Sequence, residues 1–251
     1  NLTGDEFDYN EMIKNEAESI GMFVSGHPTA RLGHIATMYN PTKLADIKAT
    51  GGSKETYTVL GTITQIAIKT NKAGNKSIAV LVDDGTDTVT TYLPKKVVQS
   101  IEKGEEIKRI TRAKEKNIEL KETKKSEKLK GVINDDSIEV MEPIELNDVY
   151  KFEVKTRGWD ENVNVVITDI EKLATAKDGS LPYEMKITND SMIPKIKKVA
   201  DLHQDKNGAY VRLNLMDGNH IVLEHRVKLS VPFIIAIEKI VGKGNIVTKE
   251  I

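Results

Sequence analysis

Apolar residues near the start of the chain follow a helical period. Between residues 10 and 24 they recur at three- and four-residue steps, at Met12, Ile13, Ala17, Ile20 and Val24. This spacing predicts an amphipathic helix over residues 10–24. Ser25-Gly26-His27-Pro28 should end it, because proline cannot continue a helix and glycine accepts a left-handed cap. We expect a short link to follow and then a flexible joint at Gly51-Gly52-Ser53.

From Tyr57 the apolar period changes from helical to alternating. Residues 57–68 are rich in β-branched side chains and predict one long strand, which Gly61 allows to bend. The polar segment 69–76 predicts a hairpin loop, and residues 77–82 predict the partner strand. The turn sequence Asp83-Asp84-Gly85-Thr86-Asp87 leads to a third strand over residues 88–93.

A helix should begin at Pro94, since proline is favoured in a first turn, and should end at Gly104. Two more strands are expected near Glu106–Arg112 and Gly131–Val140. Three strands, a helix and two strands is the order of the five-stranded OB β-barrel. We therefore predict such a barrel from Tyr57 to about Pro143.

The C-terminal part alternates between short strands and helices. Strands are expected at 183–188, 210–216, 220–229 and 245–249, and helices at 191–203 and 232–241. This βαββαβ order predicts a small ferredoxin-like domain. The predicted fold class is thus α+β. Its parts are a helical linker with the Ser25–Pro28 junction (1–52), an OB-fold domain (53–145), acidic connecting strands (146–173) and a C-terminal α+β domain (174–251).

Composition narrows the class of protein without giving a function. The 251 residues carry a formal net charge of −1, so any site for a polyanion must come from local patterning. There are no cysteines, which excludes disulfides and cysteine-based zinc sites and fits a cytoplasmic location. No apolar run approaches the roughly 20 residues that cross a bilayer. The N-terminus has no initiating Met and no signal segment, so the chain is expected to be processed or cut from something longer.

The loop between the first two predicted strands is the leading candidate for binding single-stranded nucleic acid. In OB folds this loop and strands 2 and 3 hold nucleic acid. Lysines can contact phosphate, and asparagines can bond to base or phosphate. The loop supplies Lys69, Asn71, Lys72, Asn75 and Lys76. The alternative is a solvated hairpin tip, where these residue types are common.

Aromatic and basic residues on the predicted barrel extend this candidate site. Bases can stack on aromatic rings, and with so few rings we expect weak, salt-sensitive and sequence-tolerant binding. The candidate rings are Tyr57 and Tyr92, which could equally pack in the core, and the candidate cations are Lys95, Lys96, Lys108, Arg109, Arg112 and Lys114. Such a charge run can also be ordinary solvated surface.

No catalytic residue, metal site or cofactor is predicted in this chain. The five histidines show no metal-ligand spacing such as HExxH. Asp83 and Asp84 could hold Mg²⁺ as a carboxylate pair, but with Gly85 they form a turn signature. His27 is expected to stabilise the turn that ends the first helix.

One segment resembles a known family. Glu16 to Pro28, ending Ser25-Gly26-His27-Pro28, is similar to the junction ahead of the OB domain in bacterial DNA polymerase III α subunits, the C-family replicative polymerases. Leu60–Ile63, Thr70–Lys76, Val82–Thr86 and Tyr92–Pro94 fall in the order of that domain, and Val241–Ile246 resembles the family's C-terminal segment.

The resemblance implies a non-catalytic C-terminal part of a bacterial or phage polymerase. Its OB domain would contact single-stranded template DNA, and its last domain would bind the clamp loader or other replisome proteins. The Mg²⁺-dependent catalytic core would lie upstream. Gly4-Asp5-Glu6-Phe7 lacks the Gln of the family's clamp-binding peptide, so clamp binding is not expected here. The alternatives are a protein-interaction module and a tRNA-binding OB module.

Overall fold

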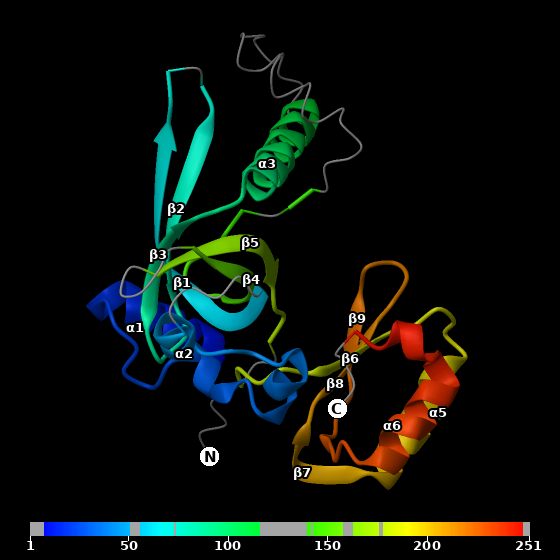
Figure 1. Cartoon of the computed structure of the whole chain (residues 1–251). Helices are drawn as coiled ribbons and strands as arrows, with labels where there is room; N and C mark the ends of the chain where they lie inside the picture. The colour runs from blue at the N-terminus through cyan, green and yellow to red at the C-terminus, as the bar shows by residue number, and fades with distance from the viewer. Residues whose placement is uncertain are drawn as a thin grey trace, which may run out of the picture. The chain divides into compact units, whose positions relative to one another are not determined.

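The chain folds into two compact units. The computed structural model describes residues 8–50, 56–72, 74–115, 140–141, 143–157, 163–175 and 178–247 (Figure 1). One unit is Thr42–Lys172, and the other combines Asn1–Pro41 with Leu173–Ile251. None of the helices in these ranges combines the length and the apolar character that crossing a membrane requires.

The first predicted helix is confirmed, but it is shorter than expected. Helix α1 spans Tyr9–Ile20. Its left-handed cap is Gly21, with a φ of 75°, and not Gly26 as predicted. Two short 3₁₀ helices follow, η1 (Pro28–Arg31) and η2 (His34–Tyr39). His27 stabilises the turn as expected, because its Nδ1 accepts a hydrogen bond of 3.2 Å from the Thr29 N–H at the start of η1.

The unit Thr42–Lys172 contains a five-stranded antiparallel sheet in the order β3-β2-β1-β4-β5. Its strands are β1 (Thr56–Thr70), β2 (Lys76–Asp83), β3 (Thr88–Tyr92), β4 (Val149–Arg157) and β5 (Asn164–Lys172). The long strand β1 serves both halves of the sheet, since residues 56–62 pair with β4 and residues 62–70 pair with β2. Gly61 of this strand also permits a close approach to β2, because a Cβ there would lie 2.6 Å from the Asp83 carbonyl oxygen.

The strand expected near Glu106–Arg112 is wrong, because helix α3 runs through it from Lys95 to Glu115. The segment is rich in Lys, Arg and Glu, which favour helix over strand. Gly104 does not end α3 but allows it to pass close to the Met141 backbone. The last two strands of the sheet are β4 and β5, in a region that we assigned mainly to connecting strands. The other expected strand, Gly131–Val140, falls almost wholly outside the described residues.

The sheet does not close into a barrel, so the predicted OB barrel is not confirmed. Its outer strands β3 and β5 come within 8 Å of each other between Cα atoms, but no strand pairing joins them in the described part of the chain. Helix α2 (Leu44–Ala49) and helix α3 complete the core against the sheet. Their contributions are Leu44, Ile47, Val97, Val98 and Ile101.

The other unit has a three-stranded sheet in the order β6-β8-β9. Its C-terminal elements are β6 (Tyr183–Lys186), α5 (Met192–Leu202), β7 (Gln204–Ala209), β8 (Val211–Asn214), β9 (His220–Val222), α6 (Val231–Val241) and η3 (Lys243–Asn245). The ferredoxin-like arrangement is not confirmed, because β6 and β8 pair directly and in parallel, with no strand between them. The expected last strand is represented by one bridge, from Ile246 to Met185.

Candidate nucleic-acid interface

Strands β1, β2 and β3 present an open outer face. Ile78, Val80 and Val82 of β2 point into the core, so the alternate residues Ala79 and Leu81 point outward. The strand register brings Tyr92 of β3 opposite Ala79, and Ala79 opposite Ala67 of β1. Tyr92 is 53% exposed and has these small neighbours beside it. This part of the face can therefore receive a flat ring against the tyrosine.

The loop between β1 and β2 is held by its own asparagines. The Asn71 side-chain oxygen accepts from the Asn75 N–H at 2.9 Å, and the Asn71 N–H donates to the Asn75 carbonyl at 3.0 Å. Gly74, with a φ of 80°, makes the turn that this loop requires. The two asparagines therefore shape the loop, whatever else they contact.

The three lysines of the loop differ in their surroundings. Lys69 and Lys72 are exposed and form no ion pair within the described ranges. Lys76 instead faces helix α3, where its Nζ lies 3.2 Å from Glu105 and 3.9 Å from Glu102. These carboxylates offset the charge of Lys76, so the positive charge available to a polyanion comes from Lys69 and Lys72.

The structure brings some of the other predicted site residues to the same region. Lys95 begins α3 three residues after Tyr92 and is exposed, without an ion pair in the part of the chain described. Lys96 is exposed but lies 3.2 Å from Asp169 of β5. Tyr57 is partly buried and packs against the core of the sheet, so its ring is less accessible than that of Tyr92.

The basic run after residue 107 lies on a helix. Lys108, Arg109, Arg112 and Lys114 all belong to the second half of α3. Lys108 is exposed, and residues 108 and 112 share a helix face because they are four positions apart. The run therefore does not lie on a fourth strand of the sheet, as the sequence analysis expected.

The acidic turn between β2 and β3 has a structural role. One Asp84 oxygen accepts from the backbone N–H of Thr86 at 2.8 Å, and the other accepts from that of Leu44 at 2.7 Å. This carboxylate thereby joins the turn to the start of α2. A hydrogen bond and ion pair from Lys48 lower the pKa of Asp87. Within the described ranges, no group of three or more His, Asp or Glu side chains could hold a metal ion.

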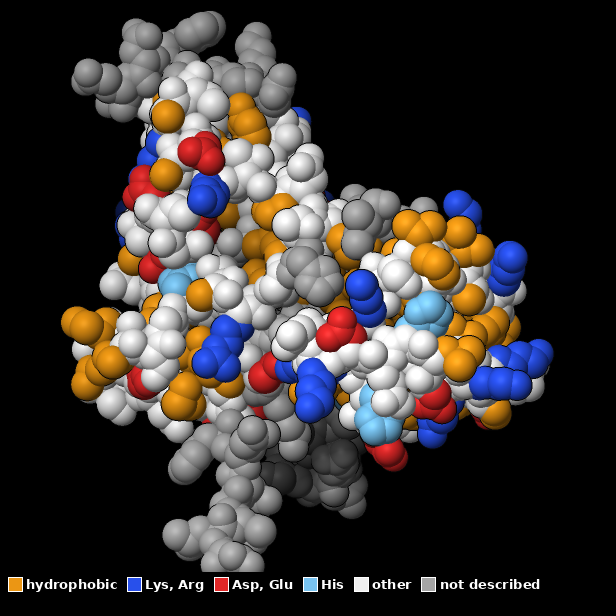
Figure 2. All heavy atoms as spheres, turned by 90° about the horizontal axis from the view of Figure 1, so that it is seen from below, with side chains coloured by type: hydrophobic (Ala, Val, Ile, Leu, Met, Phe, Trp, Pro, Cys, Tyr) orange, Lys and Arg blue, Asp and Glu red, His pale blue; other side chains and the backbone are white. Residues whose placement is uncertain are grey.

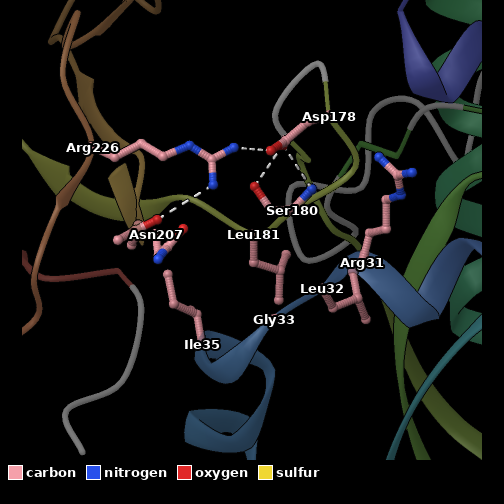
Figure 3. Close-up of a pocket in the computed structure, with 11 residues that line it drawn as sticks. Arg31, Leu32, Gly33, Ile35, Asp178, Ser180, Leu181, Asn207 and Arg226 are labelled. Atoms are coloured by element: carbon pink, nitrogen blue, oxygen red, sulfur yellow. Dashed lines mark hydrogen bonds and ion pairs between the residues drawn. The ribbon is translucent and has the colours of Figure 1, made fainter. Parts of the chain in front are cut away.

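The other unit contains a cavity of about 220 Å³ that sequence reasoning missed (Figure 3). Asp178 pairs with Arg226 and accepts from the Ser180 hydroxyl at 2.6 Å. The Arg226 guanidinium lies over the Tyr210 ring, 4.1 Å from its centroid. Leu32 lines the apolar side of the cavity. Asp178 and Arg226 are 48 residues apart, so no local motif could have indicated the pair.

The two charged groups of this ion pair, Arg226 and Asp178, have further partners. Besides its pair with Asp178, Arg226 donates from Nη1 to the Gly208 carbonyl at 3.4 Å. Burial raises the pKa of the Asp178 carboxyl, but hydrogen bonds from Ser180 and the charge of Arg226 outweigh it, so the pKa is lowered. The cluster therefore ties the segment around Asp178 to the end of β7, and we give it a structural role.

No known protein-family profile matches the chain. Over 104 residues it is 25% identical to DNA polymerase III subunit alpha of Buchnera aphidicola subsp. Schizaphis graminum. The match covers 41% of this chain but only 9% of that protein. The similarity supports a distant and partial link to DNA polymerase III alpha subunits.

Proposed function

We propose that this chain is a non-catalytic part of a replicative polymerase of the DNA polymerase III alpha type, and that its five-stranded sheet binds single-stranded DNA. The observation that carries the proposal is the exposed Tyr92 ring on the open face of β1–β3. Lys69, Lys72 and Lys95 are exposed and add positive charge that no ion pair offsets within the described residues. The distant similarity to the polymerase subunit supports the same kind of ligand.

We further propose that the sheet is an open variant of the OB fold. Its strand order, the long β1 shared between β2 and β4, and the helix after β3 all agree with that fold. The approach of β3 and β5 agrees with a partly open barrel. In this family of folds the face of strands 2 and 3 and the adjoining loop bind oligonucleotides, which is where Tyr92, Lys69 and Lys72 lie.

The expected binding is weak and depends on salt. Stacking of one base on an aromatic ring contributes roughly 1–3 kcal/mol. For single strands, each neutralised phosphate adds about 0.7 to the slope of log K against log salt, so three lysines give a slope of about 2. Neither stacking nor phosphate contact reads a base edge, and the binding should therefore tolerate changes of sequence.

Fluorescence anisotropy with labelled oligo-dT at low salt tests the proposal. Tyr92→Ala should weaken binding about tenfold, which corresponds to the loss of one stacked base. Lys69→Glu combined with Lys72→Glu should weaken binding and lower the salt slope. The matched control is Lys195→Glu with Lys198→Glu, which makes the same change of charge in the other unit. If all variants bind as the wild type does, the open face is not the site.

The same assay separates the alternatives. A preference for tRNA over oligo-dT would favour an RNA-binding module. Wild-type protein without any salt-dependent binding to single strands would favour a protein-interaction module. Binding of replisome proteins by the C-terminal elements remains a prediction, and Gly4–Phe7, considered above for clamp binding, lies outside the described residues.

A further inference from the structure

Strand β9 is an edge of the three-stranded sheet. It pairs with β8 on one side, and nothing in the described part of the chain pairs with its other side. The Leu223 N–H donates to the Val211 carbonyl, so the odd-numbered residues at this strand face β8. By the alternation of an antiparallel ladder, the backbone groups of His220 and Val222 face outward. Each of these two residues offers an N–H donor and a carbonyl acceptor to an added strand.

A groove of about 420 Å³ runs between this edge and helix α5. Ile221, at the centre of β9, lines it together with the buried Ala200 of the helix. The strand register places Ile221 opposite Leu213, which is fully buried, so both side chains point to the same face of the sheet. The apolar part of the groove therefore lies beside the centre of the unpaired edge. A strand added there would place its own central side chain next to Ile221.

The groove carries charges of both signs. Lys197 and Asp201 line it from α5, both are exposed, and neither forms an ion pair within the described ranges. They share one face of the helix because they are four positions apart. Glu224 and His225 line the groove as well, and Figure 2 shows side chains of both signs among hydrophobic ones on the surface of the C-terminal elements. A partner of one charge sign would meet repulsion here, whereas a reversed copy of the same surface sets cation against carboxylate.

We infer that the α5–β9 edge binds a second copy of this chain, about a two-fold axis that passes through Ile221. In this antiparallel register His220 of each copy pairs with Val222 of the other, so all outward donors and acceptors of both strands are matched. The two Ile221 side chains lie opposite each other, in the groove.

The axis also reverses the direction of α5. Lys197 of each copy thereby faces Asp201 of the other, and the contact is isologous, with the same surface on both sides. This inference goes beyond the proposed DNA binding and does not depend on it, because the two sites use different units of the chain.

Sedimentation velocity of the full chain tests the inference. The edge is short, so the dimer should be weak, and its fraction should rise between about 10 μM and about 1 mM protein. Val222→Pro removes from each copy an outward N–H that the ladder with β8 does not use, and should weaken association at least about tenfold. The matched control Lys195→Glu, outside the groove lining, should change association less than about twofold. A wild type that stays monomeric at about 1 mM, or a folded Val222→Pro variant that associates like the wild type, overturns the inference.

Charge reversal tests the two-fold axis, and it does so even if Val222→Pro does not fold. Lys197→Glu and Asp201→Lys should each weaken association about two- to tenfold, because each sets like charges against each other at two symmetric points. An equal mixture of these two variants should associate about as well as the wild type, since every substituted side chain then faces the opposite charge. A control mixture of Lys195→Glu with Asp201→Lys has the same total charge and should associate less well. If the first mixture associates no better than its separate variants or than the control mixture, the inference is wrong.

Discussion

Replacing Gly104 with alanine should destabilise the protein, although the same change usually stabilises a helix. Alanine is favoured over glycine inside a helix by about 0.8–1.0 kcal/mol. Here the new Cβ would overlap the Met141 carbonyl oxygen and lie 3.4 Å from a Val140 methyl. The Met141 backbone is not free to move away, because its N–H donates to the Ser100 carbonyl of the same helix at 3.2 Å.

The magnitude follows from these opposing effects. Overpacking costs typically 1–3 kcal/mol, and loss of the hydrogen bond to Ser100 costs about 0.5–1.5 kcal/mol. After subtraction of the gain in helix propensity, we expect Gly104→Ala to lower the free energy of unfolding by about 2 kcal/mol.

Urea denaturation followed by circular dichroism measures this change. Gly244→Ala is the matched control, since a Cβ at Gly244 meets no atom within 4 Å and the residue has no positive φ. The control should stay within about 0.5 kcal/mol of the wild type. A Gly104→Ala variant as stable as the wild type, or more stable, would refute the close contact between α3 and Met141.

Three further substitutions test other contacts. Tyr150→Phe should lower the free energy of unfolding by about 1–3 kcal/mol, because the hydroxyl donates to the Glu145 carbonyl at 3.1 Å and accepts from its N–H at 2.9 Å. Burial raises the pKa of Tyr150 from 10.0 to about 12, so the contribution of its hydroxyl to the free energy of unfolding is complete below pH 10 and is lost as the pH rises towards 12. Denaturation measured at increasing pH should show this loss in the wild type and not in the Phe variant. The pKa of Asp178 is lowered in the folded protein, so the carboxylate stabilises the fold fully at pH values above its ordinary pKa of 3.8 and loses this effect as the pH falls through the lower folded value. Asp178→Asn should therefore lose less stability than the wild type during acid titration. Gly208→Ala should lower the melting temperature, because its Cβ would overlap the Val227 backbone, and an unchanged temperature would contradict that contact.

Helices and strands could be predicted from the sequence where residues close together in the chain decide them. The alternation of residues 57–68 and 77–82 gave two strands of the sheet, and the Gly85 turn joined the next one, because strand period and turn chemistry act over a few residues. The pattern did not give the second half of α3. Gly104 usually ends a helix, but here a backbone segment 37 positions further along the chain occupies the space that a side chain would need.

The candidate site was predicted in part for the same reason. Lys69, Lys72 and Tyr92 could be identified because exposed loop lysines and strand aromatics are visible in the sequence. The sequence could not show which lysine charge is neutralised or which tyrosine ring is less accessible. Lys76 looks equivalent to Lys69 until α3 brings Glu105 next to it, 29 residues away in sequence. The ring of Tyr57 differs from that of Tyr92 because it packs against a core that includes β4 and β5.

The sequence by itself determined the α+β class, most of the first helix and the strands of the β1–β3 meander. Hydrophobic period, turn residues and caps decide these features, and all of them act between near neighbours. The tertiary structure alone decided which segments complete the sheet, which loop lysine is neutralised and which side of β9 stays unpaired. Those outcomes depend on contacts between residues far apart in the chain, whose free energies no local pattern encodes.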